Sequence, residues 1–111
     1  MEECVHECQT CHSVCLSALA NYCLPHGGKH AEAGHVRTML DCIQICATSA
    51  DFMLRSSELH YIVCGACAKI CDDCARSCEQ AGGMQECADV CRRCAELCRH
   101  MSQAQFAPKH N

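Results

Sequence analysis

The stretch Cys64–Cys78, with the sequence CGACAKICDDCARSC, spaces five cysteines at alternating intervals of three and four residues. Intervals of three and four place side chains on one face of an α-helix, whereas a β-strand repeats every two residues. This stretch is therefore predicted to form a helix with one face built from thiols.

The same spacing recurs in three further segments of the chain. Residues 84–101 carry an unbroken row of Cys and Met, and residues 4–23 carry a row of Cys that only Leu19 interrupts. Residues 35–54 carry a shorter row, with two cysteines. Four amphipathic helices are therefore predicted.

Breaks rich in Gly, Pro or Ser separate these segments, at residues 24–30, 55–57 and 81–83. Because short connections make consecutive helices antiparallel, the sequence predicts an all-α, up-down-up-down four-helix bundle with a cysteine-lined core. We expect a single domain over residues 1–105 and a frayed tail over residues 106–111.

The composition agrees with such a core. The chain has 111 residues and 16 cysteines, but no Trp and only two Tyr and two Phe. A neutral thiol packs as a small, polarisable hydrophobe, so cysteine can replace the usual core residues. The formal net charge of −4 and the absence of a basic run argue against a nucleic-acid partner. No apolar run approaches the roughly 20 residues of a membrane span.

The chain begins MEECVHEC, which has neither the basic region nor the apolar stretch of a secretory signal. We therefore expect a cytoplasmic protein, since the reducing cytosol keeps thiols free.

Several common uses of cysteine fit the spacing poorly. Cβ atoms four residues apart on a helix are about 5–6 Å apart, but a disulfide needs about 3.8 Å, so only bridges between rows are feasible. The ferredoxin pattern requires C-x2-C-x2-C-x3-C-P, which the chain lacks. Repeated C-x-x-C steps within helices do not suit a thioredoxin-type site. The sequence shows no Ser/His/Asp or Cys/His arrangement of the kind used in catalysis, so we do not expect an enzyme.

Soft-metal binding remains, because thiolates select Cu(I), zinc and iron–sulfur clusters. Zinc prefers four ligands in a tetrahedron, whereas Cu(I) is satisfied by two or three sulfurs. Two sulfurs about 4–5 Å apart would flank one Cu(I), judged by metal–thiolate bond lengths, and cysteines four residues apart can supply them. Those pairs are Cys4–Cys8, Cys11–Cys15, Cys42–Cys46, Cys67–Cys71, Cys74–Cys78, Cys87–Cys91 and Cys94–Cys98.

Charge limits the loading of such a core. Two thiolates around one Cu(I) leave a buried negative charge, which costs several kcal/mol. One Cu(I) per thiolate is neutral, so we expect on the order of one ion per cysteine. The candidate metal ligands are every cysteine and two histidines at row ends: Cys4, Cys8, Cys11, Cys15, Cys23, Cys42, Cys46, Cys64, Cys67, Cys71, Cys74, Cys78, Cys87, Cys91, Cys94, Cys98, His35 and His60.

The two ends of the bundle differ in composition. One collects Cys23, His26, His30, His35, Cys78 and Met84, and the other collects Cys4, Met53, His60 and Met101. We expect copper to enter at the first end, which has both Gly-Gly loops. His26 and His30 are interpreted as loop residues, His12 as a surface residue, and the methionines as packing residues.

The second predicted helix has an additional apolar row: Val36, Leu40, Ile43, Ala47, Ala50 and Leu54. A helix that is apolar over so wide an arc is predicted to face a subunit interface as well as its own core.

These rows resemble those of the four-helix-bundle copper storage proteins of the cytosolic type. The resemblance covers residues 1 to about 103 and rests on CVHECQTCHSVC, LDCIQIC, CGACAKICDDCARSC and CADVCRRCAELC. It implies that all sixteen cysteines hold many Cu(I) ions inside the bundle, and that the chain forms a homotetramer. The short second row and Leu19 depart from the pattern, which affects the expected number of ions.

The sequence thus favours a cytosolic store of Cu(I), and proteins that donate or accept copper would be its partners. A zinc or general soft-metal buffer of the same fold is one alternative. A structural helical protein stapled by disulfides is another.

Overall fold

The computed structural model describes residues 1–104, and the tail predicted at residues 106–111 lies outside the described residues. Four long helices account for most of the chain: α1 (Glu2–Ala18), α3 (Ala33–Leu54), α4 (His60–Ala81) and α5 (Gln85–Ala104). No strand occurs in the described part of the chain.

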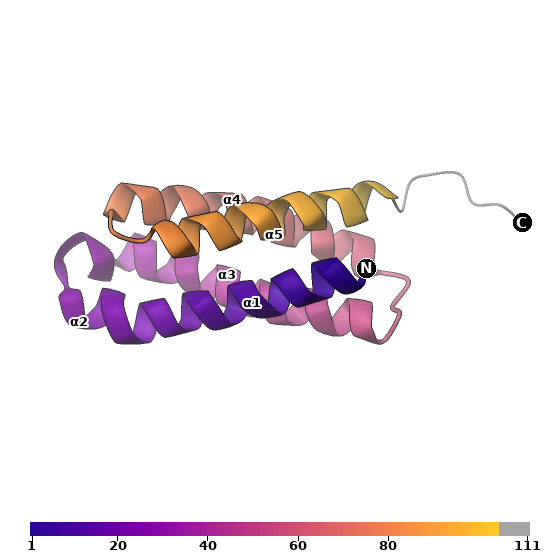
Figure 1. Ribbon diagram of the computed structural model, residues 1–111, viewed down its shortest axis with the longest axis horizontal. Coiled ribbons are helices and arrows are strands. Elements are labelled where there is room, and N and C mark those ends of the chain that lie inside the picture. Colours follow the sequence, from indigo (N-terminus) through magenta and orange to yellow (C-terminus); the bar gives the residue numbers. More distant parts are fainter. Residues whose placement is uncertain (105–111) are drawn as a thin grey trace, which may run out of the picture.

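The four long helices run back and forth to form an antiparallel bundle (Figure 1). Helix α1 packs against α3 and α5, and α4 packs against the same two helices. The predicted four-helix bundle is therefore confirmed. Within residues 1–104, no helix combines the length and apolarity needed to cross a membrane.

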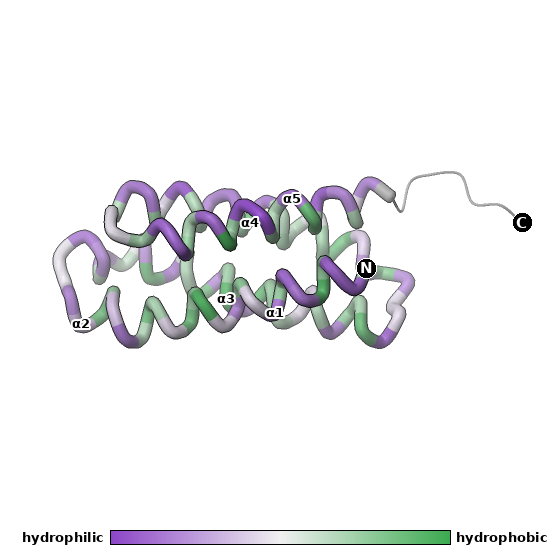
Figure 2. The backbone as a smooth tube through the Cα atoms, viewed as in Figure 1, coloured by the Kyte–Doolittle hydropathy of each residue, from purple (hydrophilic) through white to green (hydrophobic). Residues whose placement is uncertain are grey.

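The core is built from sulfur. All sixteen cysteines are buried, none more than 3% exposed. Hydrophobic and hydrophilic residues recur in turn along each helix, as expected of an amphipathic helix (Figure 2). Small residues such as Ala75 and Ala95 fill the remaining positions, and Met39, Met53 and Val90 are the bulkiest fully buried side chains. The thiols therefore occupy the place that Leu, Ile and Phe hold in most bundles.

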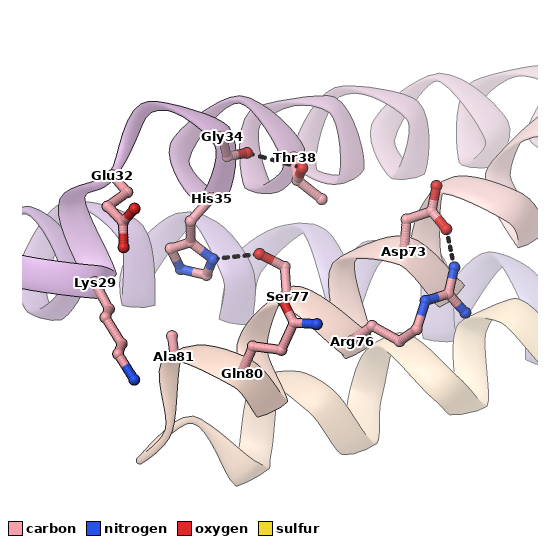
Figure 3. Close-up of a pocket in the computed structure, with 10 residues that line it drawn as sticks. All are labelled: Lys29, Glu32, Gly34, His35, Thr38, Asp73, Arg76, Ser77, Gln80 and Ala81. Atoms are coloured by element: carbon pink, nitrogen blue, oxygen red, sulfur yellow. Dashed lines mark hydrogen bonds and ion pairs between the residues drawn. The ribbon is translucent and has the colours of Figure 1, made fainter.

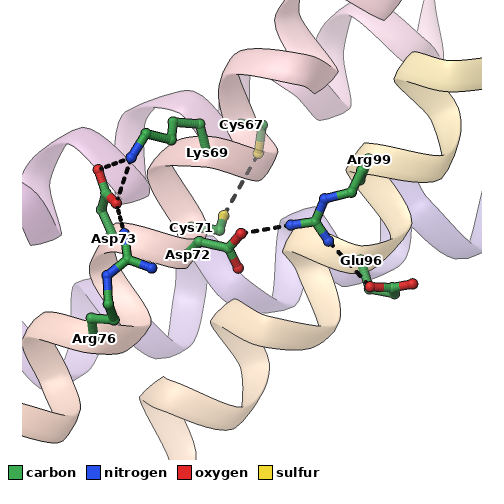
Figure 4. A network of polar contacts seen from close by, with 8 residues as sticks. All are labelled: Cys67, Lys69, Cys71, Asp72, Asp73, Arg76, Glu96 and Arg99. Carbon is green, nitrogen blue, oxygen red and sulfur yellow. Dashed lines mark hydrogen bonds and ion pairs between the residues drawn. The ribbon is translucent and has the colours of Figure 1, made fainter.

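The outer faces carry the charge. Figure 4 shows Cys67 and Cys71 in contact within the bundle, while Lys69 and Arg76 both pair with Asp73 on the solvent side of α4. Exposed pairs of this kind each contribute about 0–1 kcal/mol. Sulfur packing in the core, not the surface charges, therefore holds the helices together.

The end of α1 has an irregular turn that keeps the thiol row intact. Residues Leu19–Cys23 form a π-helical turn, in which the Leu24 N–H bonds the Leu19 carbonyl, and a short helix α2 (Leu24–His26) follows. Pro25 has no N–H and its ring crowds the carbonyl four residues earlier, which explains why the α-helical pattern changes here. Leu19 and Cys23 are 3% and 0% exposed, so the predicted row does reach Cys23.

Two loops lie side by side at this end of the bundle. One contains α2 and a 3-10 turn, Gly28–Ala31, and the other is the Gly82–Gly83 turn that joins α4 to α5. Gly82 and Gly83 have φ of 82° and 69°, a region that glycine adopts more easily than other residues. The imidazole of His30 contacts the Gly82 carbonyl at 2.8 Å, which ties the two loops together.

We predict that Gly83→Ala destabilises the metal-free bundle by about 1–2 kcal/mol, because φ is positive and an added Cβ would lie 2.9 Å from the Tyr22 hydroxyl oxygen. Tyr22→Phe removes that oxygen, so the double variant should recover the steric part of the loss. Urea unfolding of the four proteins of this cycle measures the coupling. An equal effect of Gly83→Ala in both backgrounds would show that the contact contributes nothing.

Candidate metal centre

Eleven of the sixteen buried thiols contact one another within 4.0 Å and form a connected network inside the bundle. The closest sulfur–sulfur contacts join different helices: Cys8 to Cys98 at 3.5 Å, Cys15 to Cys91 at 3.6 Å, and Cys46 to Cys71 at 3.6 Å. These distances are those of thiols in contact, and all sixteen cysteines are free. The network can therefore supply ligands from several helices to one point.

Three groups of four cysteines place their sulfurs within 4.8 Å of one another. Each group draws on at least three helices, and neighbouring groups share a residue: Cys94 belongs to the first and second, and Cys11 to the second and third. The groups are Cys8, Cys67, Cys94 and Cys98; Cys11, Cys46, Cys71 and Cys94; and Cys11, Cys15, Cys42 and Cys91.

The pairs of cysteines four residues apart account for only some of the sulfur contacts. Cys11–Cys15, Cys67–Cys71 and Cys94–Cys98 are indeed in contact, at 3.9, 3.8 and 4.0 Å. The contacts between helices are equally short or shorter, however, because thiols are small and the four rows converge on one axis. Helical spacing identifies the face of each residue but not its partner on another helix.

The remaining cysteines lie toward the two ends of the thiol rows. Cys4 lies 3.7 Å from Cys98, and Cys64 is fully buried one helical turn before Cys67. Toward the opposite end, Cys74 and Cys78 of α4 and Cys87 of α5 are buried in the same core.

His60 is not brought to a thiol. Its Nδ1 lies 2.9 Å from the backbone oxygen of Ser57, just before the start of α4. The row position that suggested a ligand is thus occupied by a residue that satisfies the backbone of the α3–α4 turn.

His35, in contrast, does meet a cysteine. Its Nε2 lies 3.6 Å from Sγ of Cys23, and Cys23 also contacts the thioether sulfurs of Met39 at 3.9 Å and Met84 at 3.5 Å. One thiol, one imidazole and two thioethers thus form a mixed cluster where the all-thiol network ends. The sequence interpretation of both methionines as packing residues missed this contact, although both lie on the thiol rows.

Burial keeps this cluster neutral. It lowers the pKa of His35 and raises the pKa of Cys23, since both charged forms lose hydration. The His35 Nδ1 lies 2.6 Å from the Ser77 hydroxyl. A neutral imidazole carries one proton, and donation of an Nδ1–H to Ser77 leaves the Nε2 lone pair facing Cys23.

Two other histidines are more enclosed than the sequence suggested. His30, interpreted as a loop residue, is only 7% exposed because it reaches the Gly82 carbonyl. His12, interpreted as a surface residue, is part-buried, with Nδ1 2.9 Å from the Ile43 carbonyl of α3. The aromatic rings of Tyr22, His26, His30 and His35 follow one another at centroid separations of 4.6–6.5 Å.

Comparison with known proteins identifies the family to which this chain belongs. The model of the family described as "Copper storage protein" matches residues 1–103. The chain belongs to the copper storage protein family. No curated protein sequence matches it significantly.

Solved structures agree with this membership. The chain is 51% identical to a protein from Nitrosospira multiformis, with a TM-score of 0.89 and coverage of 91% of this chain and 93% of that one. It is 32% identical to the Cu(I)-bound copper storage protein BsCsp3, with a TM-score of 0.84 and coverage of 91% and 96%. The apo form of copper storage protein 3 from Bacillus subtilis is 30% identical, with a TM-score of 0.82 and coverage of 91% and 97%.

We predict that the metal-free copper storage bundle loses stability as the pH rises above about 9. Burial raises the pKa of Cys23 above its ordinary value of 9.0, so the unfolded chain loses this proton first and alkaline pH favours unfolding. Chemical denaturation from about pH 8 to about pH 10.5 measures the fall. Cys23→Ala should show a shallower decline than the wild type, and parallel declines would contradict a contribution from Cys23.

Proposed function

We propose that this protein stores Cu(I) in the cytosol, holding many ions through cysteine thiolates inside the bundle. The observation that carries the proposal is the sharing of Cys11 and Cys94 between neighbouring four-sulfur groups. Shared sulfurs suit bridged Cu(I) clusters, because each copper needs only two or three of them. Membership of the copper storage family and the Cu(I)-bound relative support the same function.

Charge favours copper over zinc in this core. Four thiolates around one zinc ion carry a net charge of −2, and several such sites would bury uncompensated charge at a cost of several kcal/mol each. One Cu(I) per thiolate leaves the core neutral, as it is when every thiol is protonated. We therefore propose a loading on the order of one ion per cysteine.

The proposed ligands are the sixteen cysteines, with His35 beside Cys23. His60 contacts the Ser57 carbonyl, and its role as a ligand stays a prediction from the sequence. Copper enters, in this proposal, at the end that carries Cys23. His35, Met39 and Met84 are neutral donors there, which suit Cu(I) without adding charge.

The setting of the proposed function is a non-enzymatic store in the cytoplasm, made of one domain over residues 1–105. Sixteen buried free thiols suit a reducing compartment. Copper donor and acceptor proteins are its expected partners.

We also propose that the chain forms a homotetramer in which α3 lies at a subunit interface. Leu40 and Leu54 of α3 are 48% and 61% exposed in the single chain, while Ile43 of the same row is 7% exposed. The row thus extends from the core onto the surface, as an interface helix would.

Anaerobic titration with Cu(I) is predicted to saturate near sixteen ions per chain, one for each cysteine. Ultraviolet thiolate-to-copper absorption should rise linearly to that point, and a colorimetric chelator can count the bound ions. Saturation near about four metals per chain would instead indicate isolated tetrahedral sites of the zinc type. In a parallel assay of denatured, unreduced protein, few reactive thiols would indicate the disulfide-stapled alternative.

Glutamate substitution of Leu40 and Leu54 together is predicted to convert the tetramer into smaller species, because two charges would be buried at the α3 interface. Light scattering coupled to size exclusion measures the mass. Ile62→Glu is the matched control, since Ile62 is 56% exposed on α4. A monomeric wild-type protein, or equal dissociation by Ile62→Glu, would contradict the interface.

A further inference from the structure

A polar cleft opens on the side of the bundle, between the start of α3 and the end of α4 (Figure 3). Its volume of about 660 Å³ lies within the range of small-molecule sites, about 300–1,000 Å³. The proposed function leaves this cleft without a role. Its lining includes Lys29, Glu32, His35, Asp73, Arg76 and Ser77.

His35 joins this cleft to the thiol network. The imidazole lies in the cleft wall with Nδ1 2.6 Å from the Ser77 hydroxyl, and Nε2 of the same ring lies 3.6 Å from Sγ of Cys23. A copper ligand seated in the cleft would therefore be one side chain away from the first thiol of the store.

The cleft is lined by two basic and two acidic side chains, and one of each sign has no ion pair among the described residues. Asp73 pairs with Lys69 and Arg76, whereas neither Lys29 nor Glu32 has an ion pair within residues 1–104. Figure 3 places Lys29 and Glu32 on the same side of His35. An unpaired ammonium and an unpaired carboxylate that line the same cleft complement a ligand that itself carries both charges.

We propose that the cleft binds a small zwitterionic thiol, an amino acid or short peptide, that carries Cu(I) to and from the store. The inference rests on the proposed function. The carrier's carboxylate lies at Lys29 and its ammonium at Glu32, and its copper-bearing sulfur faces His35. Ser77 is a positioning residue that holds the ring with Nε2 toward Cys23.

A thiol carrier also balances the chemistry of transfer. The bond from copper to the carrier sulfur breaks, a bond from copper to Sγ of Cys23 forms, and the Cys23 proton leaves on the carrier thiol. No electrons move and no charge enters the core. A bare Cu(I) ion would instead require a proton to leave the dry interior by a separate route.

A second groove near the same end provides the comparison. It lies between the end of α1 and the start of α5, and it reaches Met84 and Cys87. Its only charged lining residue among those described is Glu86, so it offers no cation for a carboxylate. A carrier that is recognised by its carboxylate and its ammonium is therefore expected to bind the α3–α4 cleft.

Copper transfer kinetics test the proposal. Metal-free protein is mixed anaerobically with increasing Cu(I)–glutathione, and the ultraviolet Cu–S absorption is followed. We expect the rate to saturate, and Lys29→Gln to raise the half-saturating concentration about fivefold to tenfold while the final copper content stays unchanged. Uptake from Cu(I)–2-mercaptoethanol, an uncharged carrier, should not respond to Lys29→Gln.

Ser77→Ala should lower the maximal rate of copper uptake with little change in the half-saturating concentration. Ser77→Thr keeps the hydroxyl and should restore the maximal rate. Arg93→Gln is the matched control, because Arg93 pairs with Glu7 on the α1–α5 face. A rate that stays linear in Cu(I)–glutathione, or equal effects of Lys29→Gln and Arg93→Gln, would overturn the cleft. No uptake from either carrier by any variant would overturn the copper store itself and the cleft with it.

Discussion

Contact between neutral thiols along one axis is the interaction on which the rest of the structure depends. A thiol is small, and the sixteen buried cysteines fill the bundle with few larger side chains. The sulfurs that contact one another lie 3.5–4.0 Å apart. The same atoms that pack the core are also the donors. No rearrangement is needed to expose ligands, since every helix already directs its row to the axis. Folding and metal binding are therefore two uses of one set of contacts.

Neutral thiols would allow the core to hold different numbers of Cu(I) ions without a change in its charge. A protonated thiol and a thiolate that shares one Cu(I) are both neutral, so replacing a proton by copper leaves the charge of the interior unchanged. Buried charge, which costs several kcal/mol per uncompensated ion, is thus avoided both in the empty core and in a core with one copper per thiol. Zinc held by four thiolates offers no such equivalence, because each site would add two negative charges.

The sequence allowed the helices, their inward faces and the antiparallel order to be predicted, since spacing by three and four is set by helical geometry alone. It could not supply the contacts between helices, which depend on the relative rotation and height of two rows. Cys8 illustrates this: its row gives its face, but its partners Cys94 and Cys98 lie on α5, near the other end of the chain. His60 and His35 hold equivalent places at row ends, yet one bonds a turn carbonyl and the other meets Cys23. The different backbone around each histidine, which the spacing of the rows does not reveal, decides its partner.

The two ends of the thiol column are not equivalent, and the turn that precedes Pro25 contributes to the difference. Pro25 has no N–H to donate, and the chain forms a π-helical turn over residues 19–23 just before it. Cys23 is the last residue of this turn and remains buried. Cys23 is thereby placed among Met39, Met84 and His35 and beside the wall of the α3–α4 cleft. Neutral thioether and imidazole donors hold Cu(I) less strongly than thiolates, so under the proposed function an ion that enters at this end gains free energy by moving inward. At the other end, His60 is bonded to the backbone, and no comparable gradient from neutral donors to thiolates is formed by residues 1–104. The irregular turn at the end of α1, together with His35, Met39 and Met84, thus makes the two ends of an otherwise repetitive core chemically different.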